Sequence, residues 1–176
     1  MRPTGLIAAM MALLPICALA GTLSFLGEQD ALGADFPKRW TLTTEQHEEG
    51  LSYFAFADEF NRSHVQVFGM ERGLNGIETD GDFKTGFVTR FRTQYVGAQP
   101  WKVVKNDRLI VDGAEGRYTV ENAWLKVDGR DRFISIAFPE VQPKNYWLGL
   151  FIYSTVADQG QKYDLRKIVE ALSLPE

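Results

Sequence analysis

The stretch that follows Pro100 constrains the fold most, because β-type patterning continues from there to residue 155. Short runs rich in β-branched and aromatic residues alternate with turn signals, as expected for successive strands. Asp128-Gly129 predicts a tight hairpin, because both turn positions favour a positive φ. Asn106-Asp107 predicts a similar turn. The strand candidates of this stretch are 101–105, 108–113, 116–127, 131–139 and 146–155.

Three more strand candidates precede this stretch, at 36–45, 51–57 and 64–71. One of the later segments, 145–153, is apolar at both odd and even positions. Because side chains alternate between the two faces of a strand, this pattern predicts a central strand covered on both sides.

A helix is predicted between the two groups of strands. Phe83, Phe87, Phe91 and Tyr95 recur every four residues, which places them on one side of a helix. Each four-residue step rotates about 40° beyond a full turn, so the four aromatics spread over about 120°, the width of an ordinary core-facing stripe. Asp82 is the expected N-cap. The aromatic row is therefore interpreted as the packing surface of the helix and not as a ligand site.

A second amphipathic helix is predicted at 163–172, near the C-terminus. The order is three strands, a helix, five strands and a helix. This order predicts an α+β fold in which an antiparallel sheet of about six to eight strands is flanked by two main helices, an α/β/α sandwich.

The N-terminal segment has the features of an export signal. Residues 1–20 carry one charge at Arg2, an apolar run and a final Ala18-Leu19-Ala20, which suits signal peptidase. A retained membrane anchor is the competing interpretation. Residues 21–35 are expected to form an arm, and 36–176 a single domain. The protein is thus predicted to be exported to the periplasm or the extracellular space.

Cys17 is the only cysteine of the chain, and it lies inside the predicted signal peptide. Lipid attachment is disfavoured, because Leu14-Pro15-Ile16 lacks the small residue usually found before a lipidated cysteine. The mature chain would then contain neither a disulfide nor a thiolate site. A formal net charge of −4 argues against nonspecific nucleic-acid binding, which depends on basic residues.

No catalytic, cofactor or metal site is predicted from the motifs. His47 lies among glutamates in an expected exposed turn, and His64 begins a strand at an expected edge position. No serine lies in a nucleophile elbow, and no glycine-rich phosphate loop is present. The acidic stretch 78–82 does not fit an EF-hand loop; a looser calcium site and a helix-capping turn remain alternatives there.

Three short segments resemble the PsbP/Mog1/DcrB-like family. Phe36-Pro37-Lys38-Arg39-Trp40 is similar to the opening strand of that family, Gly113 to Tyr118 to the entry into its central strands, and Tyr163 to Ser173 to its closing helix. The resemblance implies an α/β sandwich and a role as an accessory, assembly or binding protein. It also implies that the protein is not an enzyme.

Two surfaces are candidates for binding. The polar back of the first helix and the loop before it form a candidate partner surface. Three tryptophans could line an apolar pocket, although core packing alone is the favoured interpretation. The candidate residues are Lys84, Arg90, Arg92, Glu78 and Asp80 for the partner surface, and Trp101, Trp124 and Trp147 for the pocket.

Lys102, Lys105 and Arg108 extend the cationic character toward the following strands. They form either a basic patch for an acidic partner or a solvated, salt-bridged face. The predicted function is that of an exported, non-enzymatic binding or accessory protein acting through a protein partner, such as an assembly factor or an immunity-type protein. A carrier of a small hydrophobic ligand is the alternative, and an envelope hydrolase is third. No cofactor, no nucleic acid and no stable membrane insertion after signal cleavage are expected.

Overall fold

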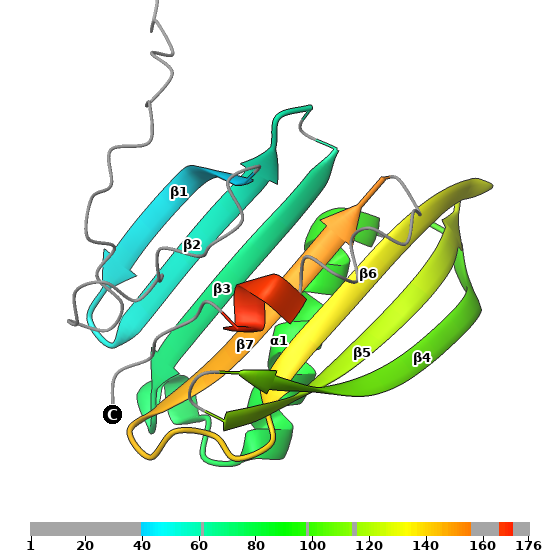
Figure 1. Ribbon diagram of the computed structural model, residues 1–176. Helices are drawn as coiled ribbons and strands as arrows, with labels where there is room; N and C mark the ends of the chain where they lie inside the picture. Colours follow the sequence, from blue (N-terminus) through cyan, green and yellow to red (C-terminus); the bar gives the residue numbers. More distant parts are fainter. Residues whose placement is uncertain (1–39, 61, 98, 114–115, 156–165, 171–176) are drawn as a thin grey trace, which may run out of the picture.

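The computed structural model describes residues 40–60, 62–97, 99–113, 116–155 and 166–170 (Figure 1). These residues form one antiparallel seven-stranded sheet with the order β1-β2-β3-β7-β6-β5-β4. The strands are β1 (Trp40–Glu48), β2 (Leu51–Asp58), β3 (Ser63–Glu71), β4 (Trp101–Gly113), β5 (Gly116–Val127), β6 (Arg130–Pro139) and β7 (Tyr146–Ser154).

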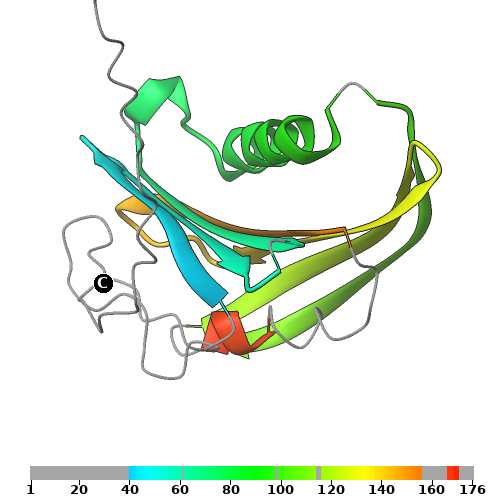
Figure 2. The same cartoon turned by 90° about the horizontal axis from the view of Figure 1, so that it is seen from above.

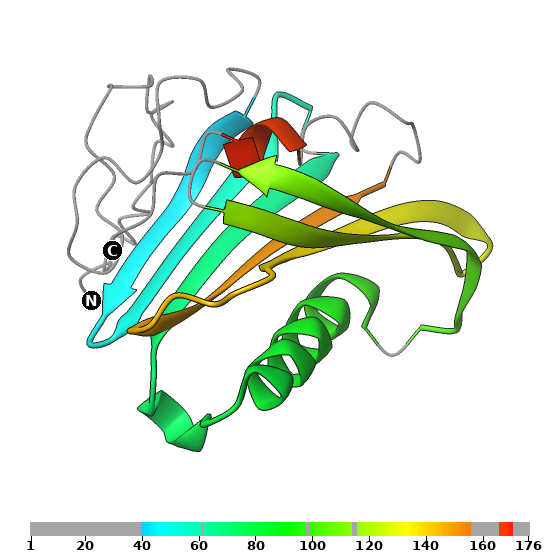
Figure 3. The same cartoon turned by 60° about the horizontal axis from the view of Figure 1, so that its bottom comes forward.

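Helices cover the two faces of the sheet. The long helix α1 (Asp80–Val96) follows a short 3-10 turn, η1 (Leu74–Gly76), and lies across one face. Residues 166–170 are helical and lie on the opposite face (Figures 2 and 3). The predicted α+β class is therefore confirmed, with one long helix and one short helical segment in the described part of the chain. The rest of the predicted terminal helix lies outside the described residues.

Each face of the sheet has its own apolar core. The core under α1 contains Phe83, Phe87 and Phe91, which are all buried. The opposite core contains Ile168 and Val169 from the second helical segment. The aromatic row of α1 is thus a packing surface, as its spacing predicts, and Tyr95 at its end is half-buried.

Strand β7 occupies the centre of the sheet, between β3 and β6. All nine of its residues are buried. Both faces of this strand are covered because α1 lies on one side and the second core lies on the other. The apolar pattern at 145–153 therefore predicted the position of the strand correctly.

The hairpin between β5 and β6 also forms as predicted. Asp128 and Gly129 have φ values of 48° and 74°, so both residues adopt the left-handed conformation that such a turn requires.

The predicted turn at Asn106-Asp107 is wrong. Strand β4 runs without interruption from Trp101 to Gly113 and pairs with β5 along its whole length. A shift of register between Val103 and Lys105 leaves Val104 as an extra residue. A β-bulge absorbs such a residue within one strand, and polar residues are tolerated because β4 is at the edge.

The start of α1 differs from the prediction by one turn. Thr79, not Asp82, is the N-cap, and its hydroxyl oxygen accepts a hydrogen bond from the Asp82 amide at 3.1 Å. The Thr79 hydroxyl also donates to the Asp82 carboxylate at 2.6 Å. Asp82 therefore lies in the first turn, where a carboxylate favours the helix dipole.

Both histidines lie elsewhere than predicted. His47 belongs to strand β1, since the strand extends to Glu48 and only the last two residues of the predicted polar segment form the turn. His64 is half-buried in β3, which pairs with strands on both sides and is no edge strand. The signal peptide, the arm, residues 36–39 and the first part of the predicted terminal helix lie outside the described residues.

Candidate functional site

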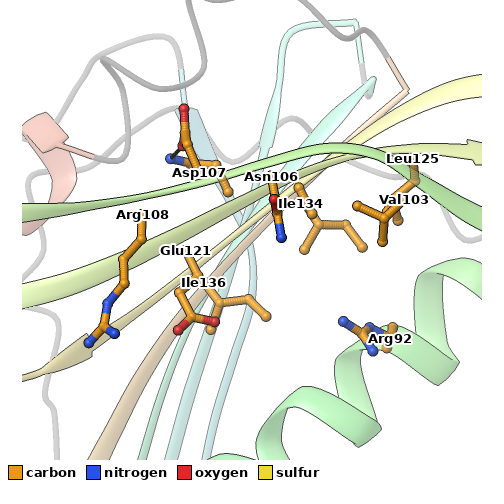
Figure 4. A pocket seen from close by; sticks show the side chains of 11 residues that line it. Arg92, Val103, Asn106, Asp107, Arg108, Glu121, Leu125, Ile134 and Ile136 are labelled. Carbon is orange, nitrogen blue, oxygen red and sulfur yellow. Dashed lines mark hydrogen bonds between the residues drawn. The ribbon is translucent and has the colours of Figure 1, made fainter.

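A groove runs between α1 and the strands β4, β5 and β6. Two adjoining cavities of about 390 Å³ and 450 Å³ make up this groove, and both are lined by Arg92, Arg108 and Glu121. We call it the α1–β5 groove. Figure 4 shows the first cavity, with Arg92 reaching from α1 toward the strands.

The floor of the α1–β5 groove is partly apolar because alternate residues of the strands point toward α1, while Asn106, Asp107 and Asn122 add polar groups to the first cavity. Ile134 and Ile136 of β6, Leu125 of β5 and Val103 of β4 line the first cavity. Val88 and Phe138 line the second.

Arg92 is half-buried and lines both cavities of the groove. Its Nε atom is buried and has no hydrogen-bond partner among the described residues. Its guanidinium carbon lies 4.7 Å from the ring centroid of Trp101. A buried donor without an acceptor costs free energy, and a ligand that brings a carboxylate or carbonyl oxygen would satisfy it.

Arg108 and Glu121 face each other across β4 and β5, yet no ion pair joins their side chains within 4.0 Å. Arg108 makes only a long hydrogen bond of 3.5 Å to Thr119. Arg92, Arg108 and Glu121 are therefore in no ion pair among the described residues. The lining also includes Lys84, which pairs with Asp80, and Asp107, whose carboxylate accepts a hydrogen bond from Asn122 at 2.7 Å.

Apolar side chains of β4 extend the groove to its open edge. Trp101, Val103 and Ile110 are 40%, 40% and 42% exposed. Their partners across the sheet are Val127, Leu125 and Thr119, of which the first two belong to the α1-side core and the third lines the second cavity, so all three continue the floor outward. Val104, at the bulge, is 61% exposed. Within the described chain, β4 has no strand on its outer side.

The predicted partner surface is divided by the structure. Lys84 and Arg92 both line the α1–β5 groove, and Lys84 pairs with Asp80 at 2.6 Å. Arg90 lies on the other flank of α1, where it lines a separate cavity. Glu78 is exposed in the loop before the helix.

The other predicted cations are also separated. Lys105 lies 4.8 Å from the Trp124 ring centroid. Trp124 precedes Leu125 of the α1-side core, so it points to the opposite face of the sheet. Arg108 points to the α1 side, and no single basic patch results.

The three tryptophans do not form a pocket. Trp147 is buried beneath α1, where it stacks on Phe83 and lies under the guanidinium of Arg72. Trp124 is on the other face against Phe133, and Trp101 is at the edge. The prediction of a common apolar pocket is wrong. Alternation along β5 turns Trp124 to the opposite face, and Trp101 and Trp147 share a face but lie on the edge strand and the central strand.

Neither histidine is part of the groove. His47 contacts Glu45 at 2.7 Å through Nε2 and Ser52 at 3.2 Å through Nδ1. His64 packs against the Tyr95 ring, and burial lowers the pKa of this imidazole below its usual range, with Asp58 opposing the shift. The side chains lining the two groove cavities include no histidine, serine or cysteine.

Two of the three carboxylates of the acidic stretch 78–82 bind protein groups, since Asp80 pairs with Lys84 and Asp82 accepts a hydrogen bond from Thr79. Within the described ranges no cluster of three or more metal-ligating side chains is found. No described helix has the length and apolarity needed to cross a membrane.

The sequence interpretation missed several groove residues, chiefly Glu121, Thr119 and Ile136. The alternation along β5 and β6 indicates that Thr119, Glu121 and Ile136 share one face of the sheet. It does not show which face α1 covers.

Comparisons with known proteins add a likeness of fold. No protein-family model matches the chain, and no curated protein matches it. Among solved structures, it is similar to cyanobacterial PsbP (CyanoP) from Synechocystis sp. PCC 6803, with a TM-score of 0.45 and 14% identity. The match covers 80% of this chain and 84% of that one. This likeness concerns the fold alone.

Proposed function

We propose that this chain is an exported, non-enzymatic binding protein that holds an acidic segment of a partner protein in the α1–β5 groove. The observation that carries the proposal is Arg92, which lines both cavities of the groove and whose buried Nε has no hydrogen-bond partner among the described residues. A partner carboxylate would supply an acceptor through a charge-assisted hydrogen bond.

The shape and charge of the groove favour a polypeptide partner. The two cavities adjoin along α1, and the exposed apolar residues of β4 extend them to the edge of the sheet. An extended segment with apolar side chains could cover this floor while its acidic groups meet Arg92 and Arg108. Exposed apolar patches rimmed by polar residues are typical of protein interaction sites.

The absence of histidine, serine and cysteine from the linings of the two groove cavities favours binding over hydrolysis. Transient binding of this kind needs a few well-placed anchors, and aromatic and arginine residues are the usual ones. Trp101 and Arg92, which contact each other at the rim, are the expected anchors.

Site-specific photocrosslinking in the native host tests the proposal. A photoreactive residue at Val103, on the groove rim, should give a discrete crosslinked partner. The same residue at Val141, which is 86% exposed in the loop after β6, is the control and should not. Equal crosslinking from both positions, or none from Val103, would contradict the proposal.

Charge reversal tests the role of the arginines once the partner is isolated. The double variant Arg92→Glu, Arg108→Glu should bind it at least about tenfold more weakly, because like charges would then meet across the interface. Lys144→Glu makes the same type of change at an exposed loop residue away from the groove and should bind normally.

A further inference from the structure

A third cavity lies on the other flank of α1, facing β2 and β3. Its volume is about 210 Å³, and we call it the β3-side cavity. Leu51, Met70 and Ile77 are among its lining residues, together with the aromatic side chains that pack α1 onto the sheet. It shares no lining residue with the α1–β5 groove.

The loop before α1 forms one wall of the β3-side cavity. Asn75 has φ 56° and Gly76 has φ 69°, so the chain turns sharply there. This turn brings the Asn75 side chain and Ile77 to the cavity. Asn75 is the only uncharged polar side chain of the lining.

Among the described residues, Arg90 is the only charged one that lines the β3-side cavity. Arg90 lines the cavity, and its guanidinium carbon lies 5.4 Å from the ring centroid of Phe68 and 5.8 Å from that of Phe91. Arg90 makes no ion pair with any described residue, and no acidic side chain lines the cavity. The charge next to the cavity is therefore positive and uncompensated by the lining.

Gly86 leaves the cavity uncovered from the helix side. A glycine inside a helix is less favourable than alanine by about 1 kcal/mol. Apart from the two neighbouring residues and the nearby backbone of the helix, no described heavy atom lies within 4 Å of the position where a Cβ would stand, so packing does not require glycine there. A longer side chain at this position would extend over the cavity that Gly86 lines.

We propose that the β3-side cavity binds a small aromatic carboxylate, with the ring among the apolar side chains and the carboxylate on Arg90. An apolar cavity of about 150 Å³ is enough for benzene, so 210 Å³ suits one ring with a short substituent. The carboxylate end is assigned by charge complementarity to Arg90. This site is independent of the partner groove.

Phenylacetate is the probe for the test, and two-dimensional amide NMR of the uniformly ¹⁵N-labelled protein is the measurement. Saturable shifts should be confined to residues of the cavity, including Gly86, Ile77 and Arg90. A ligand of about ten heavy atoms is expected to bind with a Kd on the order of 0.1–10 mM. Phenylacetamide, which has the same shape without the charge, should bind roughly threefold more weakly.

Variants locate the binding. Gly86→Met should cover the cavity and abolish the saturable shifts, and it should not destabilise the helix because methionine is a good helix former. Thr93→Met makes a similar exposed addition on α1 at a residue that lines none of the three cavities, and it should bind phenylacetate normally. Arg90→Gln should remove the preference for phenylacetate over phenylacetamide.

Two results would overturn the proposal: unsaturated or absent shifts with the unmodified protein, or unchanged binding by Gly86→Met. Equal affinity for phenylacetate and phenylacetamide would overturn the assignment of the carboxylate to Arg90. None of these results bears on the partner groove, whose crosslinking test uses Val103.

Discussion

At the scale of single residues, two glycines near Phe87 have opposite surroundings. Gly149 lies in the central strand β7, and a Cβ there would come within 2.7 Å of the Phe87 ring. Gly86 has open space at the corresponding position. The close approach of α1 to the sheet therefore depends on Gly149, because only a residue without a side chain leaves room for the ring.

Gly149→Ala should destabilise the protein by about 1–3 kcal/mol, since an added methyl would force Phe87 or the strand to move. Urea unfolding measures the change. In a Phe87→Leu background the same substitution should cost at least about 0.5 kcal/mol less, because the clashing ring atoms are gone. An equal cost in both backgrounds would show that the clash is not with Phe87.

Single residues also show a limit of sequence interpretation. Asp82 and Thr79 are both good N-caps, and residue type alone could not choose between them. The conformation of the loop before α1 selects the N-cap. Thr79 has the extended backbone of an N-cap residue, with φ −118° and ψ 153°, and the helix begins after it. Asp82 then falls in the first turn.

At the scale of elements, aromatic stacking joins the C-terminal half of α1 to β3 and β7. Tyr95 stacks on Tyr153 with ring centroids 4.7 Å apart, and it contacts His64 at 5.6 Å. Gln66 of β3 donates a hydrogen bond to the Tyr95 hydroxyl. Burial raises the pKa of Tyr95 well above its usual range. His64 therefore contacts α1 directly, through the ring of Tyr95.

His64 should make the protein less stable in mild acid. Burial lowers its pKa in the folded state below the ordinary value of 6.5, so the unfolded chain binds the proton more tightly. The contribution of neutral His64 to the stability of the fold is fully present above pH 6.5 and is lost as the pH falls from there through the folded-state pKa. The unfolding free energy of the wild type minus that of His64→Gln should therefore decrease from pH 7.5 to 5.5, as measured by urea unfolding. A difference that stays constant or grows toward acid would be the opposite of this expectation.

At the scale of the whole molecule, coverage of the sheet is uneven. Both faces of β7 are buried, whereas β4 at the edge keeps apolar side chains exposed. Exposed apolar edge strands favour association with other chains. The lysines of β4 and the bulge near Val104 limit such pairing, as they do in other edge strands.

Ile110→Lys should raise solubility without changing the fold. Ile110 is 42% exposed, so its replacement should change the unfolding free energy by at most about 0.5 kcal/mol. The ammonium sulfate concentration needed for precipitation should increase. Val120→Lys is the contrasting variant, because Val120 is 2% exposed and a buried lysine should prevent stable folding. If Ile110→Lys unfolds the protein as well, the edge strand is more deeply packed than its exposure indicates.

The sequence by itself determined the elements that depend on local pattern. The four-residue interval of aromatics determined which side of α1 is buried, and the doubly apolar run at 145–153 determined the central strand. Turn chemistry determined the hairpin at Asp128-Gly129. These features are set by neighbours along the chain, so a reader of the sequence could predict them.

Only the tertiary structure decided which residues line the same cavity. Arg90 and Arg92 are two residues apart, yet α1 carries them to cavities on opposite flanks. Trp124 and Trp147 both lie in strands, next to apolar residues, yet they lie on opposite faces of the sheet. Glu121 and Arg92 line the same groove although nothing in the sequence links them. The physical reason is that the position of α1 on the sheet depends on packing between distant segments, and local patterns carry no information about that position.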